Sequence, residues 1–208
     1  MKRTFLSAIM VVISLSLISC GGGGGGSAPP PTIVTQILSN SAVDGDIQVT
    51  LAGSIIIRQN NTQSVFAGID PVTFDESRAF LDFSLSTVPL NASIVSATLI
   101  IFINDIQPST GTIPIRIDLV SFSELSGSDF DSTPIATPIA FPVFQTDFKD
   151  YVAVDVTSLM AQAQNLFLPH FQIRILLDFS AASGLIEIND TTGFNRVALA
   201  PLLQVEYF

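Results

Sequence analysis

The sequence predicts an all-β fold, a two-sheet antiparallel, jelly-roll-like sandwich with one short helix. Three observations favour this class. Apolar and polar residues alternate with a period of two along most of the chain, which is typical of strands with one buried face. Gly, Asn, Asp and Pro separate these stretches at short intervals. The composition, 48% hydrophobic and only 12% charged, supplies a large core and argues against disorder.

The chain begins with a segment typical of a secretory signal peptide. Lys2 and Arg3 precede an apolar run over residues 5–17. That run is shorter than the roughly 20 residues of a membrane-spanning helix, and it matches the apolar region of a signal peptide. The alternative is a buried N-terminal strand or helix, but the basic flank favours export. We therefore expect residues 1–19 to be removed.

The end of this segment, Leu17-Ile18-Ser19-Cys20, resembles the lipobox of bacterial lipoproteins. The resemblance implies cleavage after Ser19 and lipid attachment to the thiol of Cys20, which is the only cysteine of the chain. Several acyl chains make a stable membrane anchor, whereas a single chain binds only marginally. Residue 21 is Gly rather than Asp, which by the family's sorting rule implies the outer membrane. The alternative is an unmodified, buried cysteine.

Residues 20–31 are expected to form the lipidated cysteine and a tether. Six consecutive glycines are followed by Ser, Ala and three prolines, which combine a flexible coil with a short stiff spacer. The glycine run lacks the Lys-Ser/Thr of a phosphate-binding loop. Residues 32–208 show no second break in composition and are long enough for one well-packed domain.

Strands are expected throughout residues 32–208. Alternation is clearest where Ile113, Ile115 and Ile117 take turns with more polar neighbours. Residues 97–103 are apolar on both faces, which predicts a central strand covered on both sides. The remaining predicted strands lie at 113–120, 152–156, 171–179 and 202–207, and near 46–51, 54–59, 64–69, 79–85 and 185–189.

One segment breaks the period of two. Residues 157–165 are rich in Ala, Leu, Met and Gln, which are good helix formers. Asp155 or Thr157 could cap the N-terminus of this helix, and Pro169 prevents its continuation. We expect a single helix of about two turns here.

Four stretches together resemble the DNRLRE-domain family of bacterial β-sandwich modules, which are related to carbohydrate-binding modules. They are 78–85 (RAFLDFSL), 94–99 (IVSATL), 154–159 (VDVTSL) and 200–207 (APLLQVEY). Their order and spacing cover most of residues 40–208, although the hexapeptide that names the family is absent. The resemblance implies sugar binding on exposed aromatic rings. Since the chain has no Trp, this role would fall to Tyr151 or to a Phe.

Composition excludes several kinds of chemistry. A formal net charge of −10 argues against nucleic acid, which needs a basic surface. A single His and a single Cys exclude a His-rich metal centre, a cysteine-ligated zinc site and a disulfide framework. His170 is expected to be an ordinary surface or strand-edge residue rather than a catalytic base. We expect no enzyme, because accidental pairs of carboxylates are common among 18 acids.

The acids nevertheless suggest one cofactor. Calcium takes six to eight oxygen ligands, which loop aspartates and nearby carbonyls supply. The candidates are Asp44 with Asp46, and Asp129 with Asp131; neither pair belongs to an EF-hand pattern, and solvated turn acids are the alternative for each. Three arginines, Arg78, Arg116 and Arg174, are isolated among acids, so we expect local pairing and no basic patch.

These observations predict an outer-membrane lipoprotein that carries a non-catalytic binding or adhesion module, with an extracellular or envelope polysaccharide as its ligand. The alternative is a structural envelope or surface-assembly protein that acts through protein partners and binds no sugar. The doubly apolar strand at 97–103 would suit such a protein. The membrane face, the oligomeric state and the ligand itself stay open.

Overall fold

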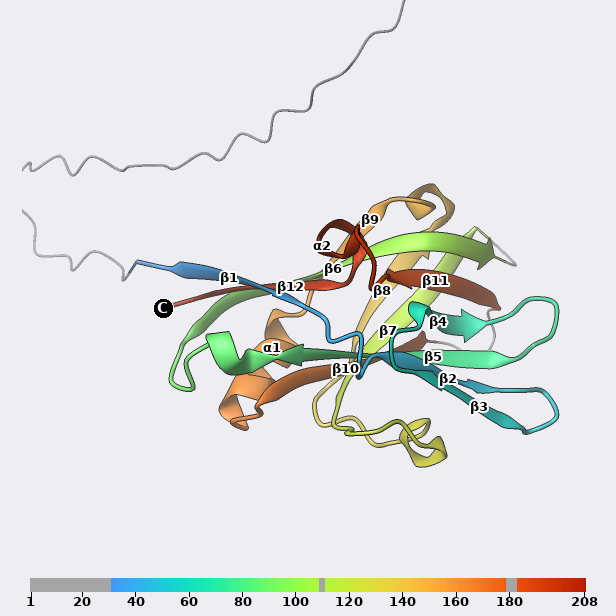
Figure 1. Cartoon of the computed structure of the whole chain (residues 1–208), viewed down its shortest axis with the longest axis horizontal. Helices are drawn as coiled ribbons and strands as arrows, with labels where there is room; N and C mark the ends of the chain where they lie inside the picture. The colour runs from blue at the N-terminus through green and yellow to red at the C-terminus, as the bar shows by residue number, and fades with distance from the viewer. Residues whose placement is uncertain (1–30, 109–110, 179–182) are drawn as a thin grey trace, which may run out of the picture. The chain divides into compact units, whose positions relative to one another are not determined.

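A computed structural model describes residues 31–108, 111–178 and 183–208 (Figure 1). The predicted signal peptide, Cys20 and the glycine run lie outside the described residues. Residues 31–208 form one compact unit. Within the described part of the chain, no helix is both long and apolar enough to cross a membrane.

The described chain is built from twelve strands and two short α-helices. The strands are β1 (Ile33–Leu38), β2 (Gly45–Val49), β3 (Ile55–Gln59), β4 (Gln63–Ile69), β5 (Glu76–Ser84), β6 (Ile94–Pro108), β7 (Thr112–Val120), β8 (Ile139–Phe144), β9 (Tyr151–Asp155), β10 (His170–Leu177), β11 (Gly184–Asp190) and β12 (Leu202–Tyr207). The helices are α1 (Thr157–Asn165) and α2 (Arg196–Leu199). This arrangement confirms the predicted all-β, sandwich-like class.

All strand pairs are antiparallel, and they follow one continuous, curled path rather than two separate sheets. Strands β3, β2, β5, β10, β7 and β8 pair in that order and form what we call the β5 layer. Strands β1, β12, β6 and β9, with β11 and β4, form the β6 layer. The β4–β5 hairpin joins the two layers.

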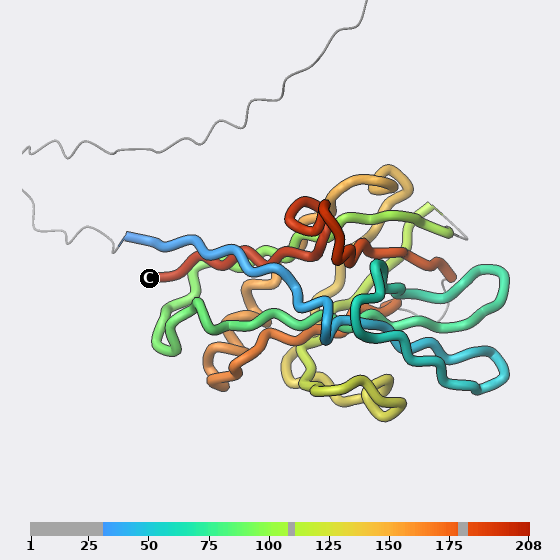
Figure 2. Tube along the Cα trace, viewed as in Figure 1, coloured from blue at the N-terminus to red at the C-terminus, as the bar shows by residue number. Residues whose placement is uncertain are grey.

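The main core lies between these layers. Leu99, Ile101 and Leu203 of the β6 layer and Leu81 and Ile173 of the β5 layer belong to one buried cluster. Strand β6 is central, as expected, because its first half pairs with β12 and β9 and its second half with β11. Its other face is only half-buried, so the expected double covering is incomplete. The first and last strands, β1 and β12, lie side by side (Figure 2).

Helix α1 lies where the sequence predicts it, but its cap differs. The N-cap residue is Val156, and neither Asp155 nor Thr157 takes that position. Instead, the Asp155 carboxylate accepts a hydrogen bond from the backbone N–H of Thr157 at 2.9 Å. The Thr157 hydroxyl accepts one from Ala97 N of β6 at 2.9 Å, which ties the helix to the central strand. Helix α2, a single turn, was not expected.

A second, smaller core lies on the outer face of the β5 layer. There the connection between β7 and β8, residues 121–138, folds back over the sheet; we call it the covering segment. Its residues Phe122 and Phe130 pack with Ile47 and Phe80 of the strands. Gln172 of β10 holds the segment through two hydrogen bonds with the backbone of Phe122, at 3.0 and 2.8 Å. The covering segment therefore shields part of the outer face of the β5 layer from solvent.

Candidate functional site

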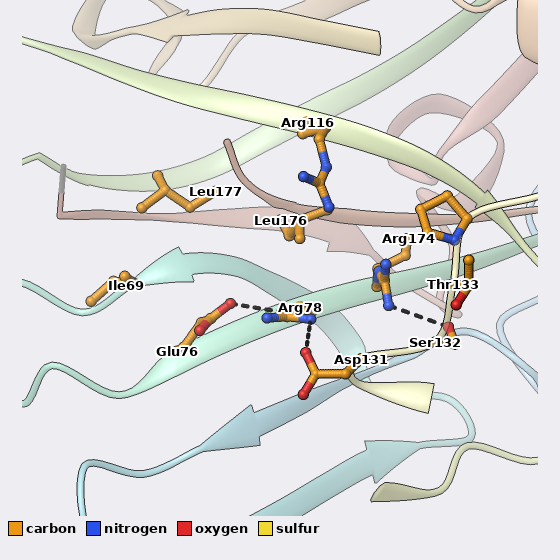
Figure 3. A pocket seen from close by; sticks show the side chains of 11 residues that line it. Ile69, Glu76, Arg78, Arg116, Asp131, Ser132, Thr133, Arg174, Leu176 and Leu177 are labelled. Atoms are coloured by element: carbon orange, nitrogen blue, oxygen red, sulfur yellow. Dashed lines mark hydrogen bonds and ion pairs between the residues drawn. The ribbon is translucent and has the colours of Figure 1, made fainter. Parts of the chain in front are cut away.

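Beside the covering segment, the outer face of the β5 layer holds a cavity of about 420 Å³. Three arginines project into it from three strands (Figure 3), and we call it the arginine cavity. The residues that decide its chemistry are Glu76, Arg78, Arg116, Asp131, Arg174 and Leu176. Alternation along β5, β7 and β10 turns the strand residues of this set away from the main core, and strand register brings them together; Asp131 comes from the covering segment.

Arg174 is the structural member of this group. Its side chain is buried, and it forms an ion pair with the equally buried Asp118, which lies opposite it on β7. Its Nη1 donates to the carbonyls of Asp129 and Phe130 at 3.1 and 2.7 Å, and to the Ser132 hydroxyl at 3.2 Å. Arg174 therefore fastens the covering segment to the sheet.

Arg78 is held from three sides by neighbouring side chains. Its Nε lies 2.7 Å from Glu76, its Nη1 lies 2.9 Å from Asp131, and its guanidinium stacks 3.7 Å from the ring centre of Phe130. Nη1 also donates to the Phe130 carbonyl. Among the described residues, none accepts a hydrogen bond from Nη2, although an arginine carries five N–H donors.

Arg116 is similar. Its Nε and Nη2 donate to the two oxygens of Asp118 at 2.8 and 3.1 Å, a bidentate pairing that fixes the guanidinium plane. No described residue accepts a hydrogen bond from its Nη1. The expected local pairing of the arginines with acids is thus present, and in addition all three arginines line one cavity. Glu76, Asp118 and Asp131 balance their charge.

The first calcium candidates, Asp44 and Asp46, are both fully buried and have different partners. Asp44 accepts a hydrogen bond from the backbone N–H of Asp82 at 2.7 Å. Burial and the neighbouring Asp190 carboxylate raise the pKa of Asp44 to about 8. Asp46 is paired with Arg58, at 2.7 Å; burial raises its pKa to about 6 against the opposing charge of Arg58.

The second calcium candidates, Asp129 and Asp131, also have different partners. Asp129 accepts hydrogen bonds from the backbone N–H and the hydroxyl of Ser126, at 2.8 and 2.7 Å, and so closes a turn of the covering segment. Asp131 is mostly exposed and pairs with Arg78 in the cavity. Among the described residues, no group of three or more His, Cys, Asp or Glu is placed to hold a metal ion. Calcium binding stays a prediction.

Tyr151, the candidate for sugar stacking, does not line the arginine cavity. It lies on β9 with its ring half-exposed and packed edge-on against Phe102, at 5.0 Å between ring centres. Its hydroxyl donates to the carbonyl of Ala198 at 2.9 Å. Tyr151 therefore belongs to the β6 layer and lies outside the arginine cavity.

His170 has no partner that can be recognised from the sequence, but in the structure it lies beside a carboxylate. Its Nδ1 lies 2.9 Å from a carboxylate oxygen of the buried Asp82, beside a cavity of about 380 Å³ that also contains Ser121 and Ser123. Among the described residues, no serine hydroxyl forms a hydrogen bond with His170. The pair is thus incomplete as a nucleophile-activating system.

Comparisons with known proteins add no family. No family model matches the chain, and no curated protein matches it. One solved structure it was compared with is the "Structure of infectious bursal disease virus Gx strain", with 14% identity and a TM-score of 0.15. The match covers 89% of this chain, which spans 40% of the viral chain. A likeness at this level carries no argument, and the lipoprotein and DNRLRE-domain resemblances stay predictions.

Proposed function

We propose that this protein is a non-catalytic binding module for a polysaccharide, and that the arginine cavity is where the sugar binds. The observation that carries the proposal is the composition of this cavity. Among the described residues, none accepts a hydrogen bond from Arg78 Nη2 or Arg116 Nη1, and both arginines line the cavity together with the carboxylates Glu76 and Asp131 and the apolar Leu176. Sugar hydroxyls both donate and accept hydrogen bonds, and the C–H face of a sugar ring suits an apolar surface.

The rigidity of these groups supports the proposal. Arg78 is held by two carboxylates and an aromatic ring, and Arg116 is held by both oxygens of Asp118. Long side chains usually lose conformational entropy when they bind a ligand. Here the protein has already immobilised them, so a ligand would meet donors that point in fixed directions.

The N-terminal segment supplies the location in this proposal. Lipid on Cys20 anchors the module to the outer membrane, and residues 21–31 form the tether. Processing would remove Lys2 and Arg3 but no acid, which leaves the exported chain still more acidic. An anionic membrane surface repels such a body, so the lipid is needed to keep it there.

Calorimetry against neutral and acidic polysaccharides tests the proposal. Residues 31–208 can be used by themselves, because both cores lie within them. Arg116→Gln should weaken binding about 10–100-fold, the effect of losing a charge-assisted hydrogen bond. Asp118 keeps Arg174 as its partner in this variant, so the fold should survive.

Lys149→Gln is the matched control, since Lys149 lies over Phe148 and outside the cavity. Each titration is repeated with and without calcium. Calcium-dependent glycan binding would support the candidate aspartates as calcium ligands. If folded protein binds no glycan, or if Arg116→Gln binds as well as the unaltered chain, the proposal is wrong.

A further inference from the structure

Strand β3 lies at an edge of the β5 layer and pairs only with β2 among the described strands. Two backbone hydrogen bonds show which way its residues face: Thr50 N donates to Ser54 O at 2.9 Å, and Asn60 N donates to Asp44 O at 3.3 Å. In an antiparallel pair, alternate residues point their backbone groups at the partner strand. The even-numbered residues of β3 thus face β2, and Ile55 and Ile57 direct their N–H and C=O groups away from the sheet.

The side chains on this edge are apolar and exposed. Ile55, Ile56 and Ile57 have exposed fractions of 52%, 45% and 42%. Natural edge strands are usually protected by charges, by proline or by a bulge. Edge strand β8 carries Pro142, but β3 has no proline. Its one charged residue, Arg58, is already paired with the buried Asp46.

We propose that β3 is a self-association surface that pairs antiparallel with β3 of a second copy, around a two-fold axis at Ile56. This proposal goes beyond glycan binding and does not depend on it. With the axis at Ile56, this residue meets its own counterpart and Ile55 lies opposite Ile57. Arg58 then faces Ser54, so no like charges meet.

The register follows from the sequence of the strand. Moving the axis by one residue, to Ile57, would place Ile55 opposite Gln59 and Ile56 opposite Arg58, which buries polar groups against apolar ones. Only the axis at Ile56 matches three isoleucines with three isoleucines. A second copy is therefore a better partner for this edge than a strand of mixed polarity. The joined strands would continue the β5 layer from one copy into the next.

The contact is small compared with the roughly 1,600 Å² of a standard stable interface, so we expect a weak dimer in solution. Sedimentation of residues 31–208 over a wide concentration range should show a reversible monomer–dimer equilibrium. Ile56→Lys should weaken the dimer at least about tenfold, because two ammonium groups would meet at the axis. Leu51→Lys is the matched control, since Leu51 is 76% exposed in the β2–β3 turn and outside the paired strand.

Mixing provides a test of register. Ile56→Lys and Ile56→Glu should each be monomeric, and an equal mixture should form a heterodimer because the opposite charges face each other. Thermal unfolding of each variant checks the fold. Glycan binding should not change, since Ile56 does not line the arginine cavity; failure of self-association is thereby separated from failure of the proposed function.

Covalent capture keeps the proposal testable if a charged variant does not fold. Cα atoms of a non-hydrogen-bonded antiparallel pair lie about 4.5 Å apart, within the range of a disulfide. The only natural cysteine, Cys20, is outside residues 31–208. Ile56→Cys should form a disulfide-linked dimer under mild oxidation, and Leu51→Cys should not. A strictly monomeric unaltered chain, an Ile56→Lys variant that still dimerises, or equal cross-linking of both cysteine variants would overturn the proposal.

Discussion

The carboxylate pair formed by Asp44 and Asp190 predicts an unusual dependence of stability on pH. Both side chains are fully buried. Burial raises the pKa of each, and the neighbouring Asp190 charge raises that of Asp44 further, to about 8. Near neutral pH the Asp44 carboxyl is therefore mostly protonated. Arg196 Nη1 lies 3.6 Å from Asp190 and brings a positive charge to the pair.

The sign of the effect follows from proton linkage. The folded-state pKa of Asp44 is above its ordinary value of 3.8, so the folded chain binds this proton more tightly than the unfolded chain. The stabilising contribution is fully present below pH 3.8 and is lost as the pH rises toward about 8. One proton corresponds to a slope of up to about 1.4 kcal/mol per pH unit in the free energy of unfolding. Asp46, whose pKa is raised to about 6, acts in the same direction over the lower part of this window.

Asp44→Asn isolates this contribution. The asparagine carbonyl can still accept the hydrogen bond from Asp82 N, and its amide can donate to Asp190 as a protonated Asp44 would. Because the amide does not ionise, the variant should lose the slope that Asp44 contributes between pH 5 and 8. We expect it to be more stable than the unaltered chain at pH 8 and above.

Urea unfolding of residues 31–208 at half-unit steps of pH measures the slope directly. Glu124→Gln is the control, because this acid is exposed and forms no hydrogen bond with a described residue. Parallel stability curves for the unaltered chain and Asp44→Asn between pH 5 and 8 would refute the raised pKa of Asp44. So would a variant that is less stable at every pH.

Three further predictions concern other parts of the chain. Arg174→Ala should cost about 1.5–3 kcal/mol, the range for hydrogen bonds to a charged group, because Asp118 keeps only Arg116 as its partner and the covering segment loses its hydrogen bonds to Arg174. The covering segment should be released; urea unfolding and limited proteolysis within residues 121–138 measure both effects. Gly68→Ala should destabilise strongly, because φ is +121° and an added Cβ would lie 2.1 Å from the carbonyl oxygen of Gly184; thermal unfolding checks this. Cys20→Ser should abolish incorporation of labelled palmitate and release the protein from membrane fractions.

Each of these three predictions would be contradicted by a specific outcome. A fully stable, protease-resistant Arg174→Ala chain would show that the covering segment is held by its apolar contacts alone. An unchanged melting temperature for Gly68→Ala would contradict the close approach of β4 and β11. Membrane retention of Cys20→Ser with no labelled lipid on the unaltered chain would reject the lipoprotein prediction.

Much of the secondary structure could be predicted from the sequence, because a strand with one buried face has apolar and polar residues that alternate along it. This holds for β7, β10 and β12, and Leu, Met and Gln mark helix α1. Strands β1 and β8 were not predicted. In β8, Pro142 is typical of a loop, and it is tolerated because β8 is an edge strand. Helix α2 was missed because a single turn has no periodic signal.

The candidate site could not be predicted in the same way. The sequence by itself placed Arg116 and Arg174 on strands with alternating faces, and Arg78 directly before the predicted strand at 79–85. Only the tertiary structure decided that these strands are neighbours and that Arg174 meets Asp118, because register depends on contacts between residues far apart in the chain. The same is true of Asp44 and Asp190, which no local pattern relates. Strand β3 was predictable as a strand, but its free edge follows from topology, since alternation reveals which face is buried and not which neighbour is missing.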